Sequence, residues 1–309
     1  MSLSRENISV GVTGAAGFIG RKLCDSLLER GYNVVAADQA NIMQEAFSSN
    51  INPKLTVTPC DVTSSSSLEF LTECDVVFHL AAMASPHQCN ANMDKAFDVN
   101  VNGTMNVLKN CSNGTRVIFM SGGIVYGPPS EIPISENHPL GSNDVYSTTK
   151  IIGERLTLMM SEKGNLNVTI VRNFSTYGPG QTSDYIIPTL IEQAIGSDEL
   201  EIWNGAPTRD FTYVDDTVDA LVLLSENHEL SGEVFNMGSG VEISILDLAN
   251  SIASAAGDIP VVDLKKDVVG NTRQFCDNSK LRSHIAWKPK ISLDEGISRT
   301  TKYIKSRSH

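Results

Sequence analysis

Residues 13–20 read Thr-Gly-Ala-Ala-Gly-Phe-Ile-Gly, and this stretch decides the fold. An apolar run over residues 8–13 leads directly into it, and residues 17–30 carry apolar side chains at helical spacing before Gly31. A strand, a glycine-rich turn and a helix in this order let the backbone approach a pyrophosphate at the helix N-terminus. The stretch predicts a dinucleotide-binding unit, with a tight turn that binds nothing as the alternative.

The same strand and helix rhythm continues along the first half of the chain. Apolar runs at residues 8–13, 33–38, 55–60, 75–80, 115–121 and 167–172 predict strands, with helices between most of them. This pattern is typical of an α/β fold, a Rossmann-type doubly wound parallel sheet. Beyond residue 173 the rhythm loosens, which predicts a smaller α/β substrate-binding lobe. We expect an NAD-binding domain over 1–173, with 211–237 returning to it, and the lobe over 174–210 and 238–309.

The bulk composition excludes several classes of protein. The chain has 309 residues, 41% of them hydrophobic, and a net charge of −12. Nucleic acid and anionic membranes bind to surfaces on which Lys and Arg cluster, so neither is expected as a partner of this acidic chain. No apolar run reaches the roughly 18 residues of a membrane span, and the N-terminus lacks a signal-peptide layout, so a cytoplasmic protein is expected. Six scattered cysteines without metal-ligand spacing predict no metal site and no disulfide framework.

Asp38 ends the second predicted strand, about 20 residues beyond the glycine turn, where a carboxylate accepts hydrogen bonds from a ribose diol. It would repel a 2′-phosphate, and the next three residues carry no cation, so NAD is favoured over NADP. Asp61 and Val62, after the third strand, are candidates to border the adenine, although an ordinary strand-end Asp is the competing interpretation.

The fourth predicted strand ends in His79-Leu80-Ala81-Ala82. Small residues suit a backbone that runs alongside a cofactor. A lone His in an apolar run is more often a satisfied core residue than a catalyst, so His79 is assigned a structural role.

Tyr146-Ser-Thr-Thr-Lys150 opens a predicted helix over 146–162, and the i, i+4 spacing places both side chains on one face. An ammonium beside a phenol favours the phenolate. Lowering a tyrosine pKa from about 10 towards 7 takes roughly 4 kcal/mol, which the lysine and a positive nicotinamide ring together supply. Tyr146 then becomes an acid and base for a sugar hydroxyl. A surface pair is the alternative.

Taken together, these motifs resemble the extended short-chain dehydrogenase/reductases of the NAD-dependent epimerase/dehydratase family, which act mostly on nucleotide sugars and include UDP-glucose 4-epimerase-like enzymes. The resemblance spans essentially the whole chain. Beyond the stretches quoted above it rests on Asn100-Val-Asn-Gly-Thr104, Val125-Tyr-Gly127, Tyr177-Gly-Pro-Gly-Gln181, Arg209-Asp-Phe-Thr-Tyr-Val-Asp-Asp216, Asn236-Met-Gly-Ser-Gly240 and Trp287-Lys-Pro289.

The resemblance implies the site residues. Those for NAD are Gly14, Gly17, Phe18, Ile19, Gly20, Asp38, Asp61, Val62, Leu80, Ala81, Ala82, Asn100, Tyr146 and Lys150. Those for substrate are Ser121, Gly122, Gly123, Tyr146, Asn173, Ser175, Arg209 and Arg273.

Several substrate positions carry their own reasoning. Arg209 lies where the family's arginine contacts the substrate diphosphate, for which a planar bidentate donor is suited; an ion pair with Asp210 or Asp215 is the alternative. Arg273 matches a basic nucleotide contact more loosely. Ser175 stands where relatives often have Asn, so substrate contacts there differ. Gln274 lies near a position that affects N-acetyl tolerance and indicates no preference.

The stretch Ser121-Gly122-Gly123-Ile124 departs from the family pattern. Relatives commonly place Ser or Thr at Gly122, bonded to the sugar hydroxyl. Dehydratases place Asp and Glu at Gly123 and Ile124, and decarboxylases a Glu at Ile124, so both activities are disfavoured. Ser121 either replaces the missing hydroxyl, as a catalytic residue beside Tyr146 and Lys150, or caps the strand end.

The activity that remains needs only hydride transfer and one acid/base group: 4-epimerisation of a UDP-hexose or UDP-N-acetylhexosamine through a transient 4-keto sugar. The alternatives are an NAD(H)-dependent reductase or dehydrogenase of a keto-sugar, and a non-catalytic NAD-binding relative. The resemblance also implies a homodimer that pairs helices near residues 92–111 and 146–163. The same apolar stripes would equally suit a core.

Overall fold

The computed structural model describes residues 5–48, 50–267 and 272–307. By its internal contacts the chain divides into two compact units. The first comprises residues 1–127, 140–172 and 218–235, and the second residues 128–139, 173–217 and 236–309. Against the expected division, the contacts assign residues 128–139, 173, 211–217 and 236–237 to the second unit. The first of these segments lies there because Ile134 forms a β-bridge with Cys276.

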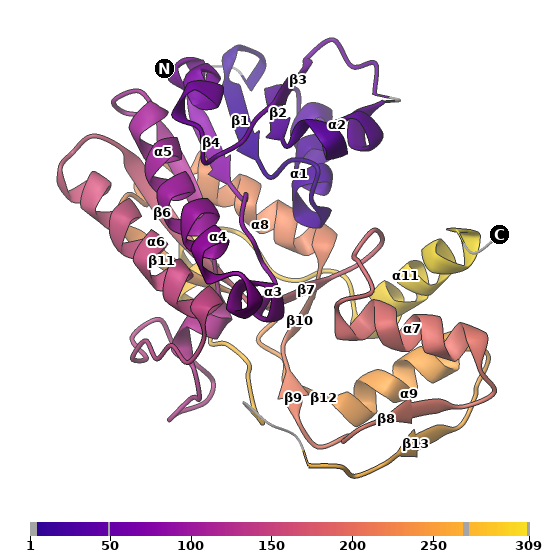
Figure 1. Ribbon diagram of the computed structural model, residues 1–309. Helices are drawn as coiled ribbons and strands as arrows, with labels where there is room; N and C mark the ends of the chain where they lie inside the picture. The colour runs from indigo at the N-terminus through magenta and orange to yellow at the C-terminus, as the bar shows by residue number, and fades with distance from the viewer. Residues whose placement is uncertain (1–4, 49, 268–271, 308–309) are drawn as a thin grey trace. The chain divides into compact units, whose positions relative to one another are not determined.

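A seven-stranded sheet forms the centre of the first unit, in the order β11-β6-β5-β4-β1-β2-β3 (Figure 1). Its strands are β1 Ser9–Thr13, β2 Asn33–Asp38, β3 Leu55–Pro59, β4 Val76–His79, β5 Arg116–Gly122, β6 Asn167–Asn173 and β11 Glu233–Met237. β1 pairs in parallel with both β2 and β4, β2 with β3, and β4 with β5. The predicted doubly wound sheet is confirmed, and each predicted strand lies within one residue of its predicted bounds.

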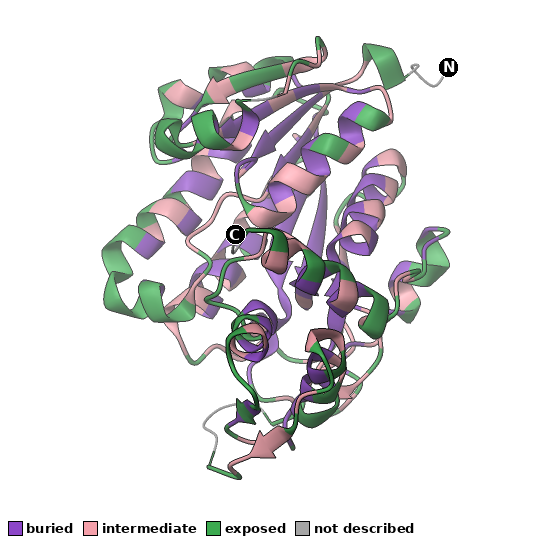
Figure 2. Cartoon of the chain, turned by 90° about the vertical axis from the view of Figure 1, so that its right-hand side faces the viewer, coloured by how far each residue is buried: buried purple, intermediate pink, exposed green. Residues whose placement is uncertain are grey.

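Helices cover both faces of this sheet. They are α1 Phe18–Glu29, α2 Ala40–Phe47, α3 Pro86–Ala91, α4 Met93–Phe97, α5 Gly103–Asn110, α6 Val145–Glu162 and α8 Val214–Glu226, with short helices η1 Arg5–Asn7, η2 Ser65–Glu73, η3 Asp98–Asn102 and η4 Gly123–Tyr126. α4, α5 and α6 lie together on one face (Figure 1). Figure 2 shows the strands buried between helices whose outer faces are exposed.

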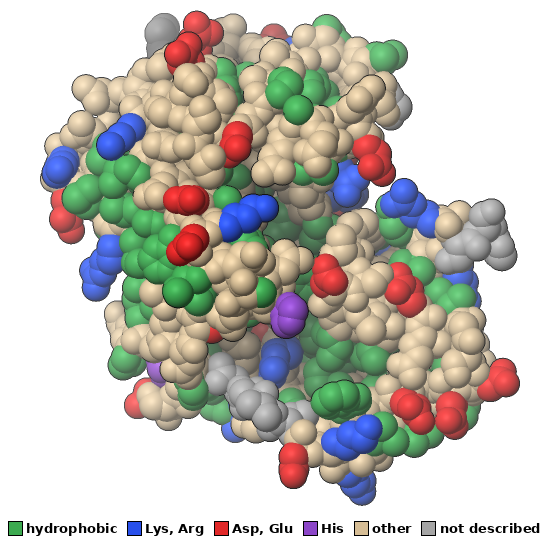
Figure 3. All heavy atoms as spheres, viewed as in Figure 1, with side chains coloured by type: hydrophobic (Ala, Val, Ile, Leu, Met, Phe, Trp, Pro, Cys, Tyr) green, Lys and Arg blue, Asp and Glu red, His purple; other side chains and the backbone are tan. Residues whose placement is uncertain are grey.

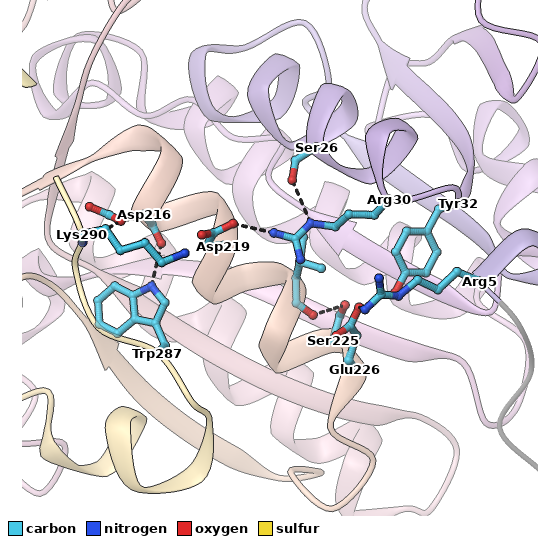
Figure 4. Close-up of polar contacts among 11 residues, drawn as sticks. Arg5, Ser26, Arg30, Tyr32, Asp216, Asp219, Ser225, Glu226, Trp287 and Lys290 are labelled. Carbon is cyan, nitrogen blue, oxygen red and sulfur yellow. Dashed lines mark hydrogen bonds and ion pairs between the residues drawn. The ribbon is translucent and has the colours of Figure 1, made fainter. Parts of the chain in front are cut away.

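Polar contacts join α1 to α8 on the other face (Figure 4). Arg30, which ends α1, donates to Asp219 at 2.5 Å and to Ser26 at 3.2 Å. Tyr32 donates to Glu226 at 2.7 Å, and Arg5 pairs with the same carboxylate at 2.8 Å. These contacts lie at the end of β2 opposite Asp38, away from the carboxyl ends of the strands, where open α/β sheets bind ligands.

The second unit contains three two-stranded sheets, which pair β7 Ser175–Tyr177 with β10 Phe211–Tyr213, β9 Thr208–Arg209 with β12 Ile243–Ser244, and β8 Leu200–Ile202 with β13 Val261–Asp263. Its helices are α7 Ile186–Gly196, α9 Ile245–Ala256, α10 Ser279–His284 and α11 Leu293–Arg307. Trp287 donates to the backbone oxygen of Asp216 at 2.9 Å, which holds the segment before α11 (Figure 4). Across the described residues, no helix has both the length and the apolar character needed to span a membrane.

Candidate active site

The glycine turn between β1 and α1 is packed so closely that side chains would not fit. Gly14 has a φ of +75°, and a Cβ there would lie 2.7 Å from the backbone nitrogen of Ala81. A Cβ on Gly20 would lie 2.1 Å from the carbonyl oxygen of Gly14. Gly17 precedes α1, and no side chain caps that helix end. The first N–H groups of α1, from Phe18 and Ile19 onward, can therefore meet a phosphate.

Asp38 lies beside this turn at the end of β2. Its carboxylate accepts hydrogen bonds from the backbone N–H groups of Ala16, at 3.0 Å, and Gln39, at 2.8 Å. Burial raises the pKa of this carboxyl, and the two N–H bonds oppose the rise. A carboxylate fixed against the glycine turn fits a ribose diol.

Asp61 and Val62 follow β3. The Asp61 carboxylate accepts from the backbone and hydroxyl of Thr63, at 2.9 and 2.8 Å, and is exposed. Val62 is buried and packs under Gly103, where a Cβ would lie 2.7 Å from a Val62 methyl. Val62 therefore shapes the apolar side of this strand end, whereas the Asp61 carboxylate faces solvent.

The end of β4 passes against the glycine turn, because Leu80 and Ala81 supply the backbone atoms nearest Gly14, with Ala82 following. His79 lies beneath them, 2.8 Å from the Thr13 hydroxyl and 3.0 Å from the Thr104 hydroxyl. Burial, with a smaller effect of Lys150, lowers the pKa of His79 to about 3. His79 is thus a neutral residue that joins β1, β4 and α5, in keeping with a structural role.

Asn100 uses its whole amide for internal bonds. It accepts from the backbone N–H of Met83 at 2.8 Å and donates to the Met83 carbonyl at 3.1 Å and the Thr149 hydroxyl at 3.0 Å. It is 2% exposed. Asn100 therefore fixes the loop after β4 against the helix that carries Tyr146, and any effect on a cofactor is exerted through that loop.

Tyr146 and Lys150 lie on α6, which begins behind the cap formed by the Asp144 side chain. The Lys150 ammonium donates to the carbonyl of Met120 at 2.8 Å and lies 6.0 Å from the centre of the Tyr146 ring. Burial lowers the pKa of Lys150 to about 8, although Glu154 opposes the shift. A buried ammonium beside a phenol favours the phenolate.

The residues at and just after the end of β5, Ser121, Gly122 and Gly123, are buried. The preceding residue, Met120, accepts the hydrogen bond from Lys150 on α6. The Ser121 hydroxyl donates to the Glu154 carboxylate at 2.6 Å and is 3% exposed. Gly122 has φ −146° and ψ 155°, an extended conformation open to any residue, and Gly123 is not among the glycines with positive φ. The backbone conformation therefore does not require glycine at either position.

Two buried residues that were not among the predicted site residues lie around Ser121. Arg172, at the end of β6, donates twice to Glu154 on α6, at 3.0 and 2.8 Å, and once to the Tyr126 hydroxyl at 2.9 Å. Burial acts to lower the pKa of Arg172, but the bonds to Glu154 outweigh it and raise it. Glu154 follows Lys150 by four residues on one helical face, a spacing that would have revealed it.

In the second unit, Arg209 ends β9, and burial lowers its pKa. Among the described residues its guanidinium bonds to the Thr208 carbonyl, at 2.7 Å, and meets no carboxylate. The neighbouring Asp210 is engaged elsewhere: it accepts from the backbone N–H groups of Ser239, Gly240 and Cys276. The guanidinium of Arg209 therefore retains donors for an anion.

Arg273 forms a bidentate ion pair with Glu242, both bonds 2.6 Å long, and its side chain is 54% exposed. Glu242 also accepts from the Thr208 hydroxyl at 2.7 Å. Because β12 pairs with β9, Ile243 lies opposite Arg209. Glu242, which was also not among the predicted site residues, thus brings Arg273 to the strand of Arg209.

Asn173 and Ser175 lie where β6 gives way to β7, and both are partly buried. Asn173 accepts from the Thr176 hydroxyl at 2.9 Å.

The structure groups the expected residues into two sets, one in each unit. Within the first unit lie the glycine turn, Asp38, the β4 and β5 ends and Tyr146 with Lys150; within the second lie Arg209 and Arg273.

Comparison with known proteins identifies the family of this chain. A model of the NAD dependent epimerase/dehydratase family matches residues 10–238. The chain is 31% identical to UDP-glucuronic acid decarboxylase 1 of Arabidopsis thaliana, over 99% of this chain and 72% of that protein. It is 32% identical to UDP-glucose 4-epimerase of Mycolicibacterium smegmatis, over 96% of this chain and 98% of that protein.

Among solved structures, UDP-glucuronic acid 4-epimerase from Bacillus cereus, in complex with UDP-glucuronic acid and NAD, is similar with a TM-score of 0.89. That likeness has 30% identity and covers 97% of this chain and 100% of that chain. The matched family model covers well over half of this sequence, so the chain belongs to the NAD dependent epimerase/dehydratase family.

Proposed function

We propose that the protein is an NAD-dependent epimerase that inverts C4 of a UDP-linked hexose or N-acetylhexosamine through a transient 4-keto sugar. The observation that carries the proposal is the buried Lys150 ammonium, fixed to the Met120 carbonyl beside the Tyr146 ring. This is acid/base equipment for one hydroxyl. The relatives include UDP-sugar 4-epimerases that match this chain over nearly its whole length.

The glycine turn, Asp38 and the end of β4 would hold NAD: Gly14 to Gly20 the pyrophosphate, Asp38 the ribose, and residues 61–62 and 80–82 the edges of the site. The absence of room for side chains at Gly14 and Gly20 fits such a close backbone approach. When bound, the coenzyme would supply a hydride acceptor, NAD⁺, and then a hydride donor, NADH, for C4 of the sugar. Tyr146 takes the hydroxyl proton as the hydride leaves, and the Lys150 charge stabilises the phenolate.

The return step needs the same two residues in reverse. After the keto sugar has rotated in the site, Tyr146 gives its proton back to the oxygen at C4 as the hydride returns to the opposite face of the sugar carbonyl. Arg209 and Arg273 would hold the diphosphate, whose two charges suit guanidinium donors. Asn173 and Ser175 would contact the sugar nucleotide. No other acid or base group is required.

Elimination and decarboxylation are disfavoured, although decarboxylases are among the relatives. Gly123 and Ile124 occupy the positions where the resemblance expects the additional carboxylates. Reduction of a keto-sugar needs only the proposed residues and is therefore the second candidate; it differs in releasing its coenzyme at each turnover.

The test uses the purified protein without added coenzyme. NAD(H) released on denaturation is quantified, and UDP-glucose, UDP-N-acetylglucosamine and UDP-glucuronic acid are each followed by NMR for the C4 epimer. Epimer formation with about one bound NAD(H) per chain is the expected result. Turnover only with stoichiometric NADH would replace the epimerase with the reductase, and release of CO₂ from UDP-glucuronic acid would replace it with a decarboxylase.

The proposal includes a cytoplasmic homodimer. A hollow of about 350 Å³ in the first unit is lined by Asn90, Met93, Phe97, Asn143, Asp144, Val145 and Thr148. Hydrophobic side chains gather over α6 and its neighbours in Figure 3. An exposed apolar surface of this kind suits a second copy. Light scattering at micromolar concentration tests it, and a monomer mass would reject the dimer.

A further inference from the structure

Two glycines at a reaction centre raise a mechanical question. Each loses more conformational freedom on folding than any other residue, so Gly122-Gly123 is intrinsically a mobile joint. Acid/base catalysis requires the reacting groups to be held within a fraction of an ångström. Since Gly122 occupies an ordinary extended conformation, its own backbone geometry does not restrict this joint. Gly122 ends β5 and Gly123 begins η4, so contacts on either side of the joint add to the restriction that these two elements provide.

The structure supplies such contacts on both sides of the joint. On the strand side, Ser121 donates to Glu154 at 2.6 Å. On the far side, the Tyr126 hydroxyl accepts from Arg172 at 2.9 Å. Glu154 and Arg172 are joined to each other by two bonds, so both flanks of Gly122-Gly123 are tied to one ion pair. We name Ser121, Tyr126, Glu154 and Arg172 the anchor network.

Burial makes the anchor network effective. Ser121, Tyr126 and Glu154 are at most 3% exposed, and Arg172 is 6% exposed. Ion pairs and charge-assisted hydrogen bonds removed from water are geometrically specific and are screened little by salt. A surface pair would restrict the joint much less.

The anchor network also shares a helix with the acid/base residues. Tyr146, Lys150 and Glu154 follow one another at four-residue steps on α6. Lys150 bonds to the Met120 carbonyl and Glu154 to Ser121, so α6 fixes two successive residues at the end of β5. The single helix α6 therefore holds both the glycine joint and the phenol of Tyr146 in place.

We propose that the anchor network is a positioning device, which holds Gly122-Gly123 at a fixed distance from Tyr146. The Ser121 hydroxyl serves this device through Glu154 and does not contact the sugar. This inference rests on the proposed function for its catalytic consequence, but the restriction of the joint is independent of it.

The experiment compares Ser121→Ala and Tyr126→Phe, which remove one flank each and leave the ion pair intact. Matched controls are Ser225→Ala, a buried serine at the end of α8, and Tyr32→Phe, whose hydroxyl bonds to Glu226. Both controls lie away from the β5 end. Hydrogen exchange of a peptide covering residues 121–127 should be roughly tenfold faster in the two test variants and unchanged in the controls.

Kinetics then separates positioning from direct contact. Both test variants should lower kcat roughly tenfold, with KM and bound NAD little changed, and the double variant should lose little more than either single one, because both act through one network. A kcat loss in Ser121→Ala with none in Tyr126→Phe would mean that the hydroxyl contacts substrate, and would overturn the inference. Unchanged exchange in both test variants would overturn it as well, whatever the activity.

Failure of the proposed function has a different signature. If the wild-type protein epimerises no UDP-sugar, faster exchange of 121–127 in the test variants still supports the positioning device. If the wild type is active and exchange does not change, the positioning device fails alone.

Discussion

The two sets of candidate residues differ in how they handle charge. In the first unit, Lys150, Glu154 and Asp38 are withdrawn from water wholly or in part, and each is bonded to backbone or to a buried partner. In the second unit, Arg273 is 54% exposed and its partner Glu242 23%. Removal of water strengthens electrostatic effects on proton transfer, whereas exposed pairs are screened and adaptable.

The difference matches the two proposed tasks. Moving a proton requires a fixed phenol and a cation of adjusted pKa, for which a rigid interior is suited. Gripping a diphosphate that must enter and leave requires donors near the surface. Arg209 is intermediate, because it is partly buried and, among the described residues, bonds only to the Thr208 carbonyl. Substitutions should therefore have smaller effects as they move from the first set to the second.

Replacing Tyr146 by Phe should have the largest effect. Without its acid/base hydroxyl, kcat should fall by roughly a thousandfold or more, while bound NAD(H) stays near the wild-type content. Steady-state turnover and cofactor content of the purified variant measure both. Unchanged turnover would remove Tyr146 from the mechanism.

Gly20→Ala should remove the cofactor. Its Cβ would lie 2.1 Å from the Gly14 carbonyl, so the turn must shift and the pyrophosphate contact is lost. We expect bound NAD(H) and activity at least a hundredfold below wild type. Gly196→Ala, at the end of α7, is the control, because nothing lies within 4 Å of its added Cβ. Circular dichroism checks that both variants fold; a normal cofactor content in Gly20→Ala would contradict the turn's role.

Arg209→Ala should raise KM for the UDP-sugar by roughly 10- to 100-fold, as expected for loss of a charge-assisted bond to a phosphate, with bound NAD(H) unchanged. Arg209→Lys should recover only part of the loss, since an ammonium cannot replace the planar guanidinium. An unchanged KM in Arg209→Ala would place the diphosphate elsewhere.

The pKa of Lys150, about 8, predicts a pH effect with opposite signs for activity and stability. Above pH 8 the ammonium loses its proton and no longer favours the phenolate, so kcat/KM should fall about tenfold per pH unit. Between pH 8 and the unfolded value of about 10.4 the unfolded chain binds more protons than the folded one, so the Lys150 contribution to stability rises with pH. The free energy of unfolding of wild type minus that of Lys150→Met should therefore increase over this window. A flat kcat/KM profile up to pH 10 would contradict the assignment.

Arg273→Ala should have the smallest effect, a two- to fivefold rise in KM, because its guanidinium is exposed and already paired with Glu242. The rise should shrink at 0.5 M NaCl, as salt screens the wild-type contact. An effect as large as that of Arg209→Ala would mean that the pair with Glu242 opens when substrate binds.

Much of the first unit could be predicted because its elements are local. The glycine turn, six of the seven sheet strands and the Tyr146 helix depend on short patterns of apolar residues, glycines and a cap, which act within about 20 residues. The assignment of residues 128–139 to the second unit could not be predicted, since Ile134 bonds to the backbone of residues 275 and 277. A pairing between residues about 140 positions apart leaves no local pattern in the sequence.

The sequence by itself determined the α/β class, the glycine turn between the first strand and helix, and the candidate acid/base pair, because each depends on residues close together along the chain. Only the tertiary structure decided what Ser121 bonds to, which cations are already paired, and which buried contacts flank the two glycines. Those properties depend on Glu154, Arg172 and Glu242, whose partners come from other elements, and a side chain's charge and freedom are set by what surrounds it in space.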